Sequence, residues 1–256
     1  MRVEDWPAEV WQLAGQGNGA APPEAWAAAG SAEAERLQNM LVYERELWQN
    51  GVEPVAGLDE VGRGPIAGPV VAAAVIWPAN IGDCLPAGID DSKKLSAKKR
   101  YALEPQIKQT ALAWAVAAVG VREIDCYNIL QATKLAMLRA LHRLPIKPRH
   151  LLLDALRLDN VKLPPPAIWQ NLAQYARLPQ TALIKGDGKS LSIAAASILA
   201  KCHRDRMMQI YDEMYPGYNL AQHAGYPTPE HKRAVFALGR SPIHRRSFVL
   251  RPIKGD

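Results

Sequence analysis

The sequence predicts an α/β layered domain built on a mixed β-sheet. Short apolar runs recur along the chain, and most are followed by a segment with the three-to-four-residue apolar spacing of a helix. The chain has 256 residues, 48% of them hydrophobic, which is enough for one sizeable core. Strands that alternate with helices of this length are typical of a layered α/β domain.

The first 50 residues differ from the rest in charge. They hold three arginines and eight acidic residues, a net −5, and the remainder carries +11, which gives the overall +6. The segment GQGNGAAPP predicts a linker between two short helical pieces within residues 1–30. From Ser31, a candidate N-cap, apolar residues fall mostly on one helical face. We therefore expect residues 1–50 to form an acidic, partly helical extension and residues 51–256 to form the main domain.

Two strands joined by a hairpin are predicted at the start of the main domain. The first covers Val55–Leu58 and ends at Asp59, and the second covers Val70–Trp77. Only a short segment rich in Gly and Pro separates them, which favours a hairpin.

The later elements continue the alternation of helices and strands. They are a basic helix capped by Ser96, a strand over Trp114–Val121, a helix over 124–144, strands at Leu151–Leu153 and Ala182–Ile184, and a helix over about 190–214. Small residues are frequent in the last helix, which predicts close packing against the sheet.

Charge and cysteine usage restrict the class of protein. The basic main body, with ten Lys or Arg against five acids in residues 201–256, indicates either a polyanionic partner or a solubilising surface. The cysteines, Cys84, Cys126 and Cys202, are widely spaced and form no CxxC pair, so neither a zinc site nor a disulfide framework is indicated. The N-terminus lacks the pattern of a signal peptide, and no apolar run is long enough for a membrane span. We expect a cytoplasmic protein.

Acidic residues follow three of the predicted strands. Asp59 and Glu60 end the first strand, Asp154 ends the strand LLLD, and Asp187 lies just beyond the last strand. Groups at strand ends of an α/β sheet can meet in one crevice. Clustered carboxylates cannot all stay ionised without cations, and oxygen ligands alone favour Mg²⁺ or Mn²⁺. The pattern predicts a two-metal site for phosphodiester hydrolysis. A turn residue or a helix cap is the alternative for Asp154.

Six segments resemble, in the same order, the type 2 bacterial ribonuclease H family, ribonuclease HII. They are AGLDEVGRGPIAGPVVAAAVI, DDSKKLS, NILQATKLAM, KGDGKSLSIAAASILAKCHRD, HAGYPTPEH and SPIHRRSF. The resemblance implies a ribonuclease H-like fold with a C-terminal helical region that binds substrate. It also implies hydrolysis of the RNA strand of RNA–DNA hybrids with two Mg²⁺ or Mn²⁺ ions, and nicking of duplex DNA 5′ of an embedded ribonucleotide. The sister family, ribonuclease HIII, lacks the arginine of the GRG segment.

The resemblance also assigns roles to individual residues. It implies that Asp59, Glu60, Asp154 and Asp187 are the catalytic metal ligands, that the loop Gly62, Arg63 and Gly64 contacts the ribose at the cleavage site, that Lys93 lies near the substrate phosphates, and that Tyr226 stacks on the next sugar. The backbone of glycine can approach a 2′-OH, the group that distinguishes RNA from DNA. Arg63 offers a cationic fork for the adjacent phosphate. We add Lys185, which precedes Asp187, as a residue that holds the acids or the phosphate.

The chain departs from the family pattern in two places. Many members have Asp-Gly-Asn where this chain has Asp154, Ala155 and Leu156. The interval from Asp154 to Asp187 is 33 residues, longer than is common, and residues 160–180 predict a surface insertion.

Other basic residues and other functions are also considered. The run His244, Arg245 and Arg246 is a candidate for binding the nucleic-acid backbone, and Arg204 serves either structure or hybrid contacts. No histidine is assigned to catalysis. The competing functions are a junction resolvase or strand-transfer nuclease on the same architecture, and a non-catalytic hybrid-binding module. We expect a monomer whose partners are RNA–DNA hybrids and ribonucleotide-containing duplex DNA, with no membrane contact.

Overall fold

A computed structural model describes residues 12–17, 31–81, 85–161 and 171–251. Its elements, in chain order, are β1 (Gln12–Gly15), α2 (Ser31–Asn39), α3 (Val42–Gln49), β2 (Val55–Val61), β3 (Val70–Ile76), α4 (Ala97–Thr110), β4 (Ala113–Val119), α5 (Val121–Arg143), β5 (His150–Asp154), α6 (Ala173–Ala176), β6 (Gln180–Leu183), the 3₁₀ turn η3 (Gly186–Gly188), α7 (Leu191–Met214), α8 (Leu220–His223) and α9 (Pro229–Leu238).

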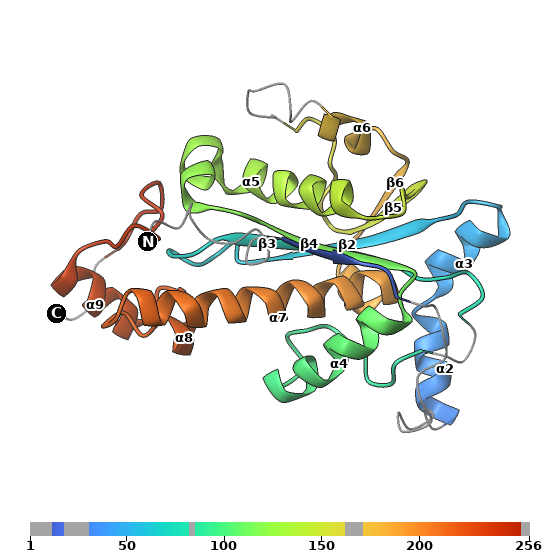
Figure 1. Cartoon of the computed structure of the whole chain (residues 1–256), viewed down its shortest axis with the longest axis horizontal. Helices are drawn as coiled ribbons and strands as arrows, with labels where there is room; N and C mark the ends of the chain where they lie inside the picture. The colour runs from blue at the N-terminus through green and yellow to red at the C-terminus, as the bar shows by residue number, and fades with distance from the viewer. Residues whose placement is uncertain (1–11, 18–30, 82–84, 162–170, 252–256) are drawn as a thin grey trace.

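One mixed sheet organises the described residues, with the strand order β1-β4-β3-β2-β5-β6. Strands β1 to β4 pair antiparallel, and β2, β5 and β6 run parallel. Helix α5 covers one face of the sheet, while α7 and α4 cover the other (Figure 1). The predicted α/β class, the mixed sheet and the hairpin of the first two main-domain strands are confirmed.

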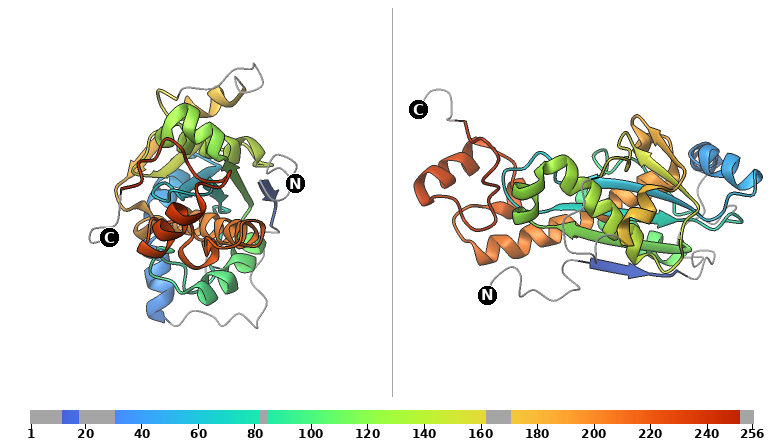
Figure 2. Two further views of the ribbon diagram at one scale, coloured as in Figure 1. Left: turned by 90° about the vertical axis from the view of Figure 1, so that its left-hand side faces the viewer. Right: turned by 90° about the horizontal axis from the view of Figure 1, so that it is seen from above.

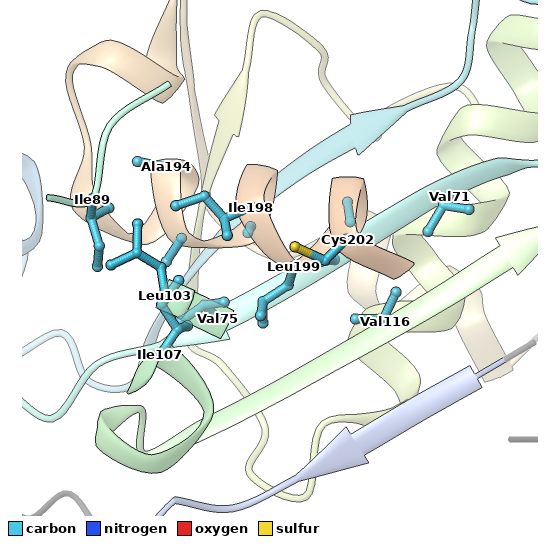
Figure 3. Close-up of a cluster of buried hydrophobic side chains, with 14 of the residues drawn as sticks. Val71, Val75, Ile89, Leu103, Ile107, Val116, Ala194, Ile198, Leu199 and Cys202 are labelled. Atoms are coloured by element: carbon cyan, nitrogen blue, oxygen red, sulfur yellow. The ribbon is translucent and has the colours of Figure 1, made fainter. Parts of the chain in front are cut away.

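Successive side chains of a strand point to opposite faces of the sheet, so each face has its own hydrophobic core. In β3, Val71 and Val75 belong to the core beneath α7, where Ile198 of α7 and Ile107 of α4 meet them (Figure 3). The alternate residues of β3, such as Ile76, belong to the core beneath α5. Each fully buried side chain of this size contributes about 1.5–3 kcal/mol.

Helix α7 lies unusually close to the central strand β2. A Cβ atom at Gly57 would lie 2.3 Å from the Cβ atom of Ser192, so only glycine fits at this contact. Next to it, Ala194, Ala195 and Ala196 are fully buried. The close packing expected from the small residues of this helix is therefore confirmed.

The N-terminal helices pack on the main core. The single helix expected from Ser31 is two helices, because the chain turns at Met40 and Leu41, which are both buried. In α3, buried Glu44 accepts hydrogen bonds from the Oγ of Ser190 at 2.6 Å and from the N–H of Ser192 at 3.0 Å. These bonds attach α3 to the first turn of α7. The domain boundary at residue 50 stays a prediction.

A strand occupies part of the region expected to hold helical pieces and a linker. Gln12–Gly15 forms β1 and pairs antiparallel with β4, with Gln12 opposite Ala117. The helical expectation is wrong for Gln12–Ala14 and the linker expectation for Gly15, because the free edge of β4 offers backbone partners that no local sequence pattern reveals. The rest of GQGNGAAPP after Gly17 lies outside the described residues.

The predicted insertion at residues 160–180 is only partly a surface feature. Leu172 and Tyr175, at α6, are buried in the core beneath α5, so this part of the segment belongs to the fold. Residues 162–170 lie outside the described residues.

Helices α8 and α9 form the predicted C-terminal helical region. They lie at the end of the molecule opposite α2 and α3 (Figures 1 and 2). From this region, the carbonyls of Gly225 and Ile243 accept hydrogen bonds at 2.9 Å from the N–H groups of Ile66 and Gly68, in the loop between β2 and β3. The C-terminal region is therefore fastened to that loop. Within the described ranges, no helix has both the length and the apolar character needed to cross a bilayer.

Candidate active site

The side-chain alternation of β2 separates the two adjacent acids. This strand continues to Val61, so Asp59 and Glu60 lie within it and not beyond its end. Gly57 faces α7, and Asp59, two residues later, faces the same side. Leu58 lies in the core beneath α5, which places Glu60 on that opposite face.

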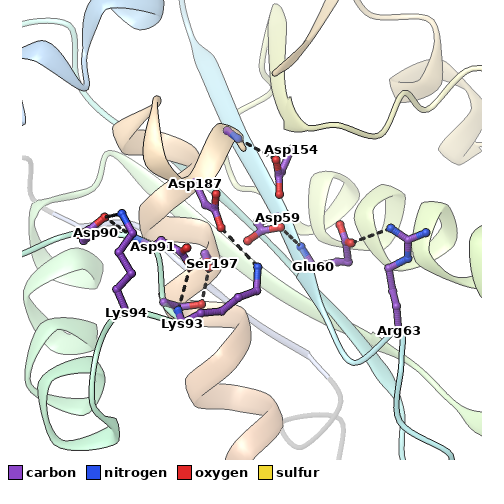
Figure 4. A network of polar contacts seen from close by, with 12 residues as sticks. Asp59, Glu60, Arg63, Asp90, Asp91, Lys93, Lys94, Asp154, Asp187 and Ser197 are labelled. Atoms are coloured by element: carbon purple, nitrogen blue, oxygen red, sulfur yellow. Dashed lines mark hydrogen bonds and ion pairs between the residues drawn. The ribbon is translucent and has the colours of Figure 1, made fainter. Parts of the chain in front are cut away.

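Three carboxylates converge on the α7 side of the sheet. Leu58 is in register with Leu153 of the parallel strand β5, so the next residues, Asp59 and Asp154, are neighbours. Asp187 comes from η3, the turn that follows β6. Carboxylate oxygens of Asp59, Asp154 and Asp187 all lie within 4.8 Å of one another (Figure 4). These three residues are called the acidic cluster below.

Backbone geometry holds Asp154 in the acidic cluster. One of its oxygens accepts a hydrogen bond from the N–H of Gly186 at 2.7 Å. The next residue, Ala155, has a left-handed backbone with φ +52°. A Cβ makes that conformation costly by about 1–2 kcal/mol, a cost that glycine would avoid. The alternative of a simple turn at Asp154 does not account for its place in the cluster.

Glu60 lies outside the acidic cluster. One carboxylate oxygen is 3.3 Å from a guanidinium nitrogen of Arg63 (Figure 4). The other oxygen is buried and has no hydrogen-bond partner among the described residues. Four convergent carboxylates were expected, and the structure brings three together with the fourth beside them.

The electrostatics of these acids oppose full ionisation. Burial raises the pKa of Asp59 well above its usual range, and the charges of Glu60 and Asp154 raise it further. Burial also raises the pKa of Asp187, with Asp154 and Asp91 adding to the effect. For Glu60, burial raises the pKa more than the nearby Arg63 lowers it. Carboxylates whose pKa values are raised by burial and by one another form a site that is short of positive charge.

The donor set of the acidic cluster fits a hard divalent cation. All three ligands offer oxygen, the atom that Mg²⁺ and Mn²⁺ prefer. Oxygens on one Mg²⁺ lie up to about 4.2 Å apart, so the observed spread of 4.8 Å needs only a small contraction around an ion. The unsatisfied oxygen of Glu60 is a further candidate ligand next to the cluster.

Two polar residues near this site were not predicted from the sequence. Asp91 adds to the raised pKa of Asp187, and Ser197 of α7 offsets part of the rise in the pKa of Asp59. Ser197 also donates to the Oγ of Ser92 at 2.6 Å. The DDSKKLS motif was the available signal for Asp91, whereas Ser197 was hidden in a run of small residues.

The two predicted lysines are placed differently. The ammonium of Lys93 is 3.5 Å from a carboxylate oxygen of Asp187. Burial alone would lower the pKa of Lys93, but the charges of Asp187 and Asp59 outweigh it and the net shift is upward. Lys185 has an exposed side chain, and the described residues include no ion pair between it and the acidic cluster. The structure therefore brings Lys93 to the site and leaves Lys185 outside it.

The segment Gly62, Arg63 and Gly64 follows directly after β2. Tyr226, from the C-terminal region, lies against it, since a Cβ at Gly64 would be 3.3 Å from the tyrosine ring. The ring of Tyr226 is 46% exposed. At Gly62, where φ is +95°, a Cβ would lie 2.3 Å from the Nε of Arg204, so packing inside the protein already demands glycine here.

Two predicted nucleic-acid contacts are wrong. His244 and Arg245 are buried, because their side chains bond within the protein and not at its surface. Arg204, for which structural and hybrid-binding roles were both open, is likewise buried and donates to three backbone carbonyls. Arg246, in contrast, is exposed.

The mixed sheet with carboxylates gathered at its strand ends defines a nuclease of the ribonuclease H-like fold that depends on divalent metal ions. The sequence profile of ribonuclease HII matches residues 56–251. The chain belongs to the ribonuclease HII family and is thus an endonuclease that hydrolyses the RNA of RNA–DNA hybrids.

Individual relatives agree with this membership. The chain is 48% identical to ribonuclease HII of Anaeromyxobacter sp. (strain Fw109-5), covering 89% of this chain and 69% of the relative. It is 47% identical to ribonuclease HII of Moorella thermoacetica, covering 86% and 98%. The crystal structure of ribonuclease H2 from Pyrococcus horikoshii OT3 superimposes with a TM-score of 0.60 at 29% identity, covering 76% of this chain and 93% of that one.

Proposed function

We propose that this endonuclease nicks duplex DNA on the 5′ side of a single embedded ribonucleotide, leaving a 3′-hydroxyl and a 5′-phosphate. The observation that carries the proposal is the position of the loop Gly62–Gly64. It continues from the strand that holds Asp59, and Tyr226 packs against its last glycine. Chemistry and sugar recognition are thus separated by only a few residues of one strand and loop.

In this proposal the acidic cluster and Glu60 are the catalytic groups. Asp59, Asp154 and Asp187 provide carboxylate oxygens on one side of β2, and Glu60 provides one from the other side after leaving Arg63. Two bound Mg²⁺ or Mn²⁺ ions would supply an activated water and stabilise the leaving oxygen. Burial and neighbouring charges raise the pKa of Asp59 and of Asp187, and a bound cation would favour the ionised form of both carboxylates.

In this proposal the loop Gly62–Gly64 and Tyr226 recognise the substrate. The backbone of Gly62 and Gly64 reads the 2′-OH of the ribonucleotide, and the exposed guanidinium of Arg63 binds the neighbouring phosphate. Tyr226 presents an aromatic face to the next sugar, where a 2′-OH would disturb close stacking. Reading two adjacent sugars identifies an RNA-to-DNA junction, so a long run of ribonucleotides is unnecessary.

The lysines have smaller roles in this proposal. Lys93, held between the acidic cluster and solvent, contacts a substrate phosphate once metal ions neutralise Asp187. Lys185 contacts the nucleic-acid backbone near the cluster as an exposed cation. A monomeric state, a cytoplasmic location and ribonucleotide-containing duplex DNA as partner remain predictions from the sequence.

The decisive experiment uses an end-labelled DNA duplex that carries one ribonucleotide, resolved on a denaturing gel. Mg²⁺ and Mn²⁺ are compared, beside an all-DNA duplex and a continuous RNA–DNA hybrid. We expect one cut 5′ of the ribonucleotide and none in the all-DNA duplex. Equal cutting of the all-DNA duplex would favour a resolvase-like nuclease, and degradation of the hybrid without a cut at the single ribonucleotide would contradict junction recognition.

A further inference from the structure

Two fully buried arginines lie behind the loop that follows β2. Arg204 comes from α7 and Arg245 from the C-terminal segment, and both have no exposed surface. Neither forms an ion pair with a carboxylate among the described residues. The two guanidinium groups are close enough that the charge of Arg204 adds to burial in lowering the pKa of Arg245 to about 9, which leaves it cationic at neutral pH.

The partners of these guanidinium groups are backbone carbonyls of one loop. Arg245 donates to the carbonyls of Gly62 and Arg63, the latter at 2.9 Å, and twice to that of Gly68 at 2.9 and 3.0 Å. Arg204 donates to the carbonyls of Pro69 at 3.0 Å and Ala67 at 3.3 Å. The residues 62–69 are therefore held from behind by six hydrogen bonds across the two side chains.

The other side of the loop is left without partners. For the N–H groups of Gly62, Arg63 and Gly64, the described residues offer no hydrogen-bond acceptor. Successive free N–H groups in a turn form a concavity that binds anionic or hydroxyl oxygens. With carbonyls bound to the arginines and three N–H groups unpartnered among the described residues, the loop has an electropositive face.

Buried charge strengthens that face. A guanidinium that is removed from water and not matched by a carboxylate exerts a field that solvent screens only weakly. Two of them donate to carbonyls of the same loop whose N–H groups at residues 62–64 have no acceptor among the described residues. Together they favour a phosphodiester oxygen in front of the loop, in the same way as other fixed positive dipoles favour anions.

We infer that Arg204 and Arg245 are positioning residues for substrate recognition, which orient the loop 62–69 and supply positive potential to the phosphodiester beside the ribonucleotide. The inference rests on the proposed function of the Gly62–Gly64 segment. It separates these two arginines from Arg63, whose exposed guanidinium would touch the substrate itself.

The test compares Arg245→Lys with Arg206→Lys. Arg206 is a suitable control because it lies on α7, two residues from Arg204, and pairs with Glu104. Lysine keeps the charge at position 245 but cannot donate to three carbonyls in the fixed geometry of a fork. For the duplex with one ribonucleotide, we expect the KM of Arg245→Lys to rise about 10- to 100-fold. Its Mn²⁺ affinity, measured by calorimetry, should not change, and Arg206→Lys should match the unmodified protein in both.

Chemical rescue distinguishes positioning and charge from simple support of the fold. In Arg245→Ala, millimolar guanidinium chloride should restore nicking, while urea, a neutral molecule of similar shape, and NaCl at the same ionic strength should not. A merely structural role predicts a lower melting temperature with an unchanged KM, or equal rescue by urea, and either result would overturn the inference. Failure of the unmodified protein to cut the single ribonucleotide would instead contradict the proposed function.

A measurement on the unmodified protein covers the case in which the variants fail to fold. Backbone ¹⁵N relaxation should show amides of Gly62, Arg63 and Gly64 as rigid as those of β2, with order parameters of about 0.85. Values below about 0.6 at these three residues would mean that the arginines do not fix the loop, and would also overturn the inference.

Discussion

Two clusters of like charge flank the end of β2, and they differ in whether the fold itself compensates their charges. The acidic cluster gathers three carboxylates, the pKa values of Asp59 and Asp187 are raised there, and of the lysines proposed for the site only Lys93 is ion-paired with it. The buried pair Arg204 and Arg245 gathers cations whose donors are occupied by backbone carbonyls. One cluster is incomplete without a ligand, whereas the other is complete within the chain.

The contrast distinguishes charged groups that await a ligand from charged groups that support the fold. A buried charge that the fold satisfies contributes to a fixed shape, and a group of charges that the fold leaves in conflict marks a place where a ligand of opposite charge binds. In this protein the two lie on either side of one short segment, so the acidic cluster and the loop Gly62–Gly64 are held in a constant relation.

The largest effect is expected when the acidic cluster loses a charge. Asp59→Asn should lower the rate of cleavage at saturating Mg²⁺ by about 10³-fold or more, because a ligand at the centre of the cluster is lost. Binding of an RNA–DNA hybrid should change little, since phosphate contacts elsewhere dominate affinity. The measurement is single-turnover cleavage with a binding assay, and near-normal turnover would contradict the assignment.

The same variant should be more stable without metal ions. The folded state raises the pKa of Asp59, so above the usual pKa of an aspartate the ionised carboxyl destabilises the folded protein. Removing that charge should raise the melting temperature in the presence of a chelator at neutral pH. Asp159→Asn is the control, because Asp159 is an exposed residue that pairs with Arg157.

The next effect tests whether the arginine pair fixes the loop. Gly62→Val should lose about 1–3 kcal/mol of unfolding free energy from the positive φ alone, and more from contact with Arg204. Gly64→Val, whose Cβ meets only the partly exposed ring of Tyr226, should be far milder. Denaturant unfolding of both variants, with nicking assays, makes the comparison. Equal destabilisation by the two substitutions would show that Arg204 does not constrain the loop.

A smaller effect is expected at Tyr226. Loss of one stacking contact, worth about 1–3 kcal/mol, should reduce kcat/KM of Tyr226→Ala on a single ribonucleotide by about 5- to 100-fold. Its melting temperature and Mn²⁺ affinity should stay unchanged, because the ring is 46% exposed. Phe236→Ala, which removes another exposed aromatic ring in the C-terminal region, should leave cleavage unaffected. An equal loss in both variants would argue against stacking.

The smallest effect concerns pH and the histidines behind Tyr226. The Nδ1 of His231 donates to the carbonyl of Tyr226, and its Nε2 accepts from the Nε2 of His244, since the Nδ1 of His244 accepts from the N–H of Ser241. Both rings are therefore neutral. Burial, together with His231 and Arg240, lowers the pKa of His244 to about 4.

A fall in pH should weaken the hydrogen-bonded pair of His231 and His244, while the arginine pair stays charged. Because the unfolded chain takes up a proton near pH 6.5 and the folded protein does not, unfolding free energy should fall by about 2 kcal/mol between pH 6.5 and pH 5 on account of His244. In His244→Gln that part of the pH dependence should be absent. Thermal or denaturant unfolding of both proteins across this range provides the measurement, and identical pH profiles would contradict the neutral pair.

Much of the fold and of the site follows from the sequence alone. The helix over Val121–Arg143 and the strands ending near Asp59 and Asp154 lie close to where the periodicity of apolar residues places them. Periodicity is enough to predict these elements, because the spacing of the buried apolar residues distinguishes a helix from a strand within a short stretch of sequence. Asp59, Asp154 and Asp187, which the structure brings together, were predicted to converge because acids that follow short apolar strands can meet at one edge of a sheet.

Contacts between distant segments were decided only by the tertiary structure. No local pattern tells that Gln12–Gly15 completes the edge of β4, or that Asp91 lies near enough to Asp187 to raise its pKa. Arg245 looks like any surface arginine in the sequence, yet it is buried against carbonyls 177–183 residues earlier. A charged side chain is stable in the interior only where several segments together supply its hydrogen bonds, and that arrangement exists only once the chain has folded.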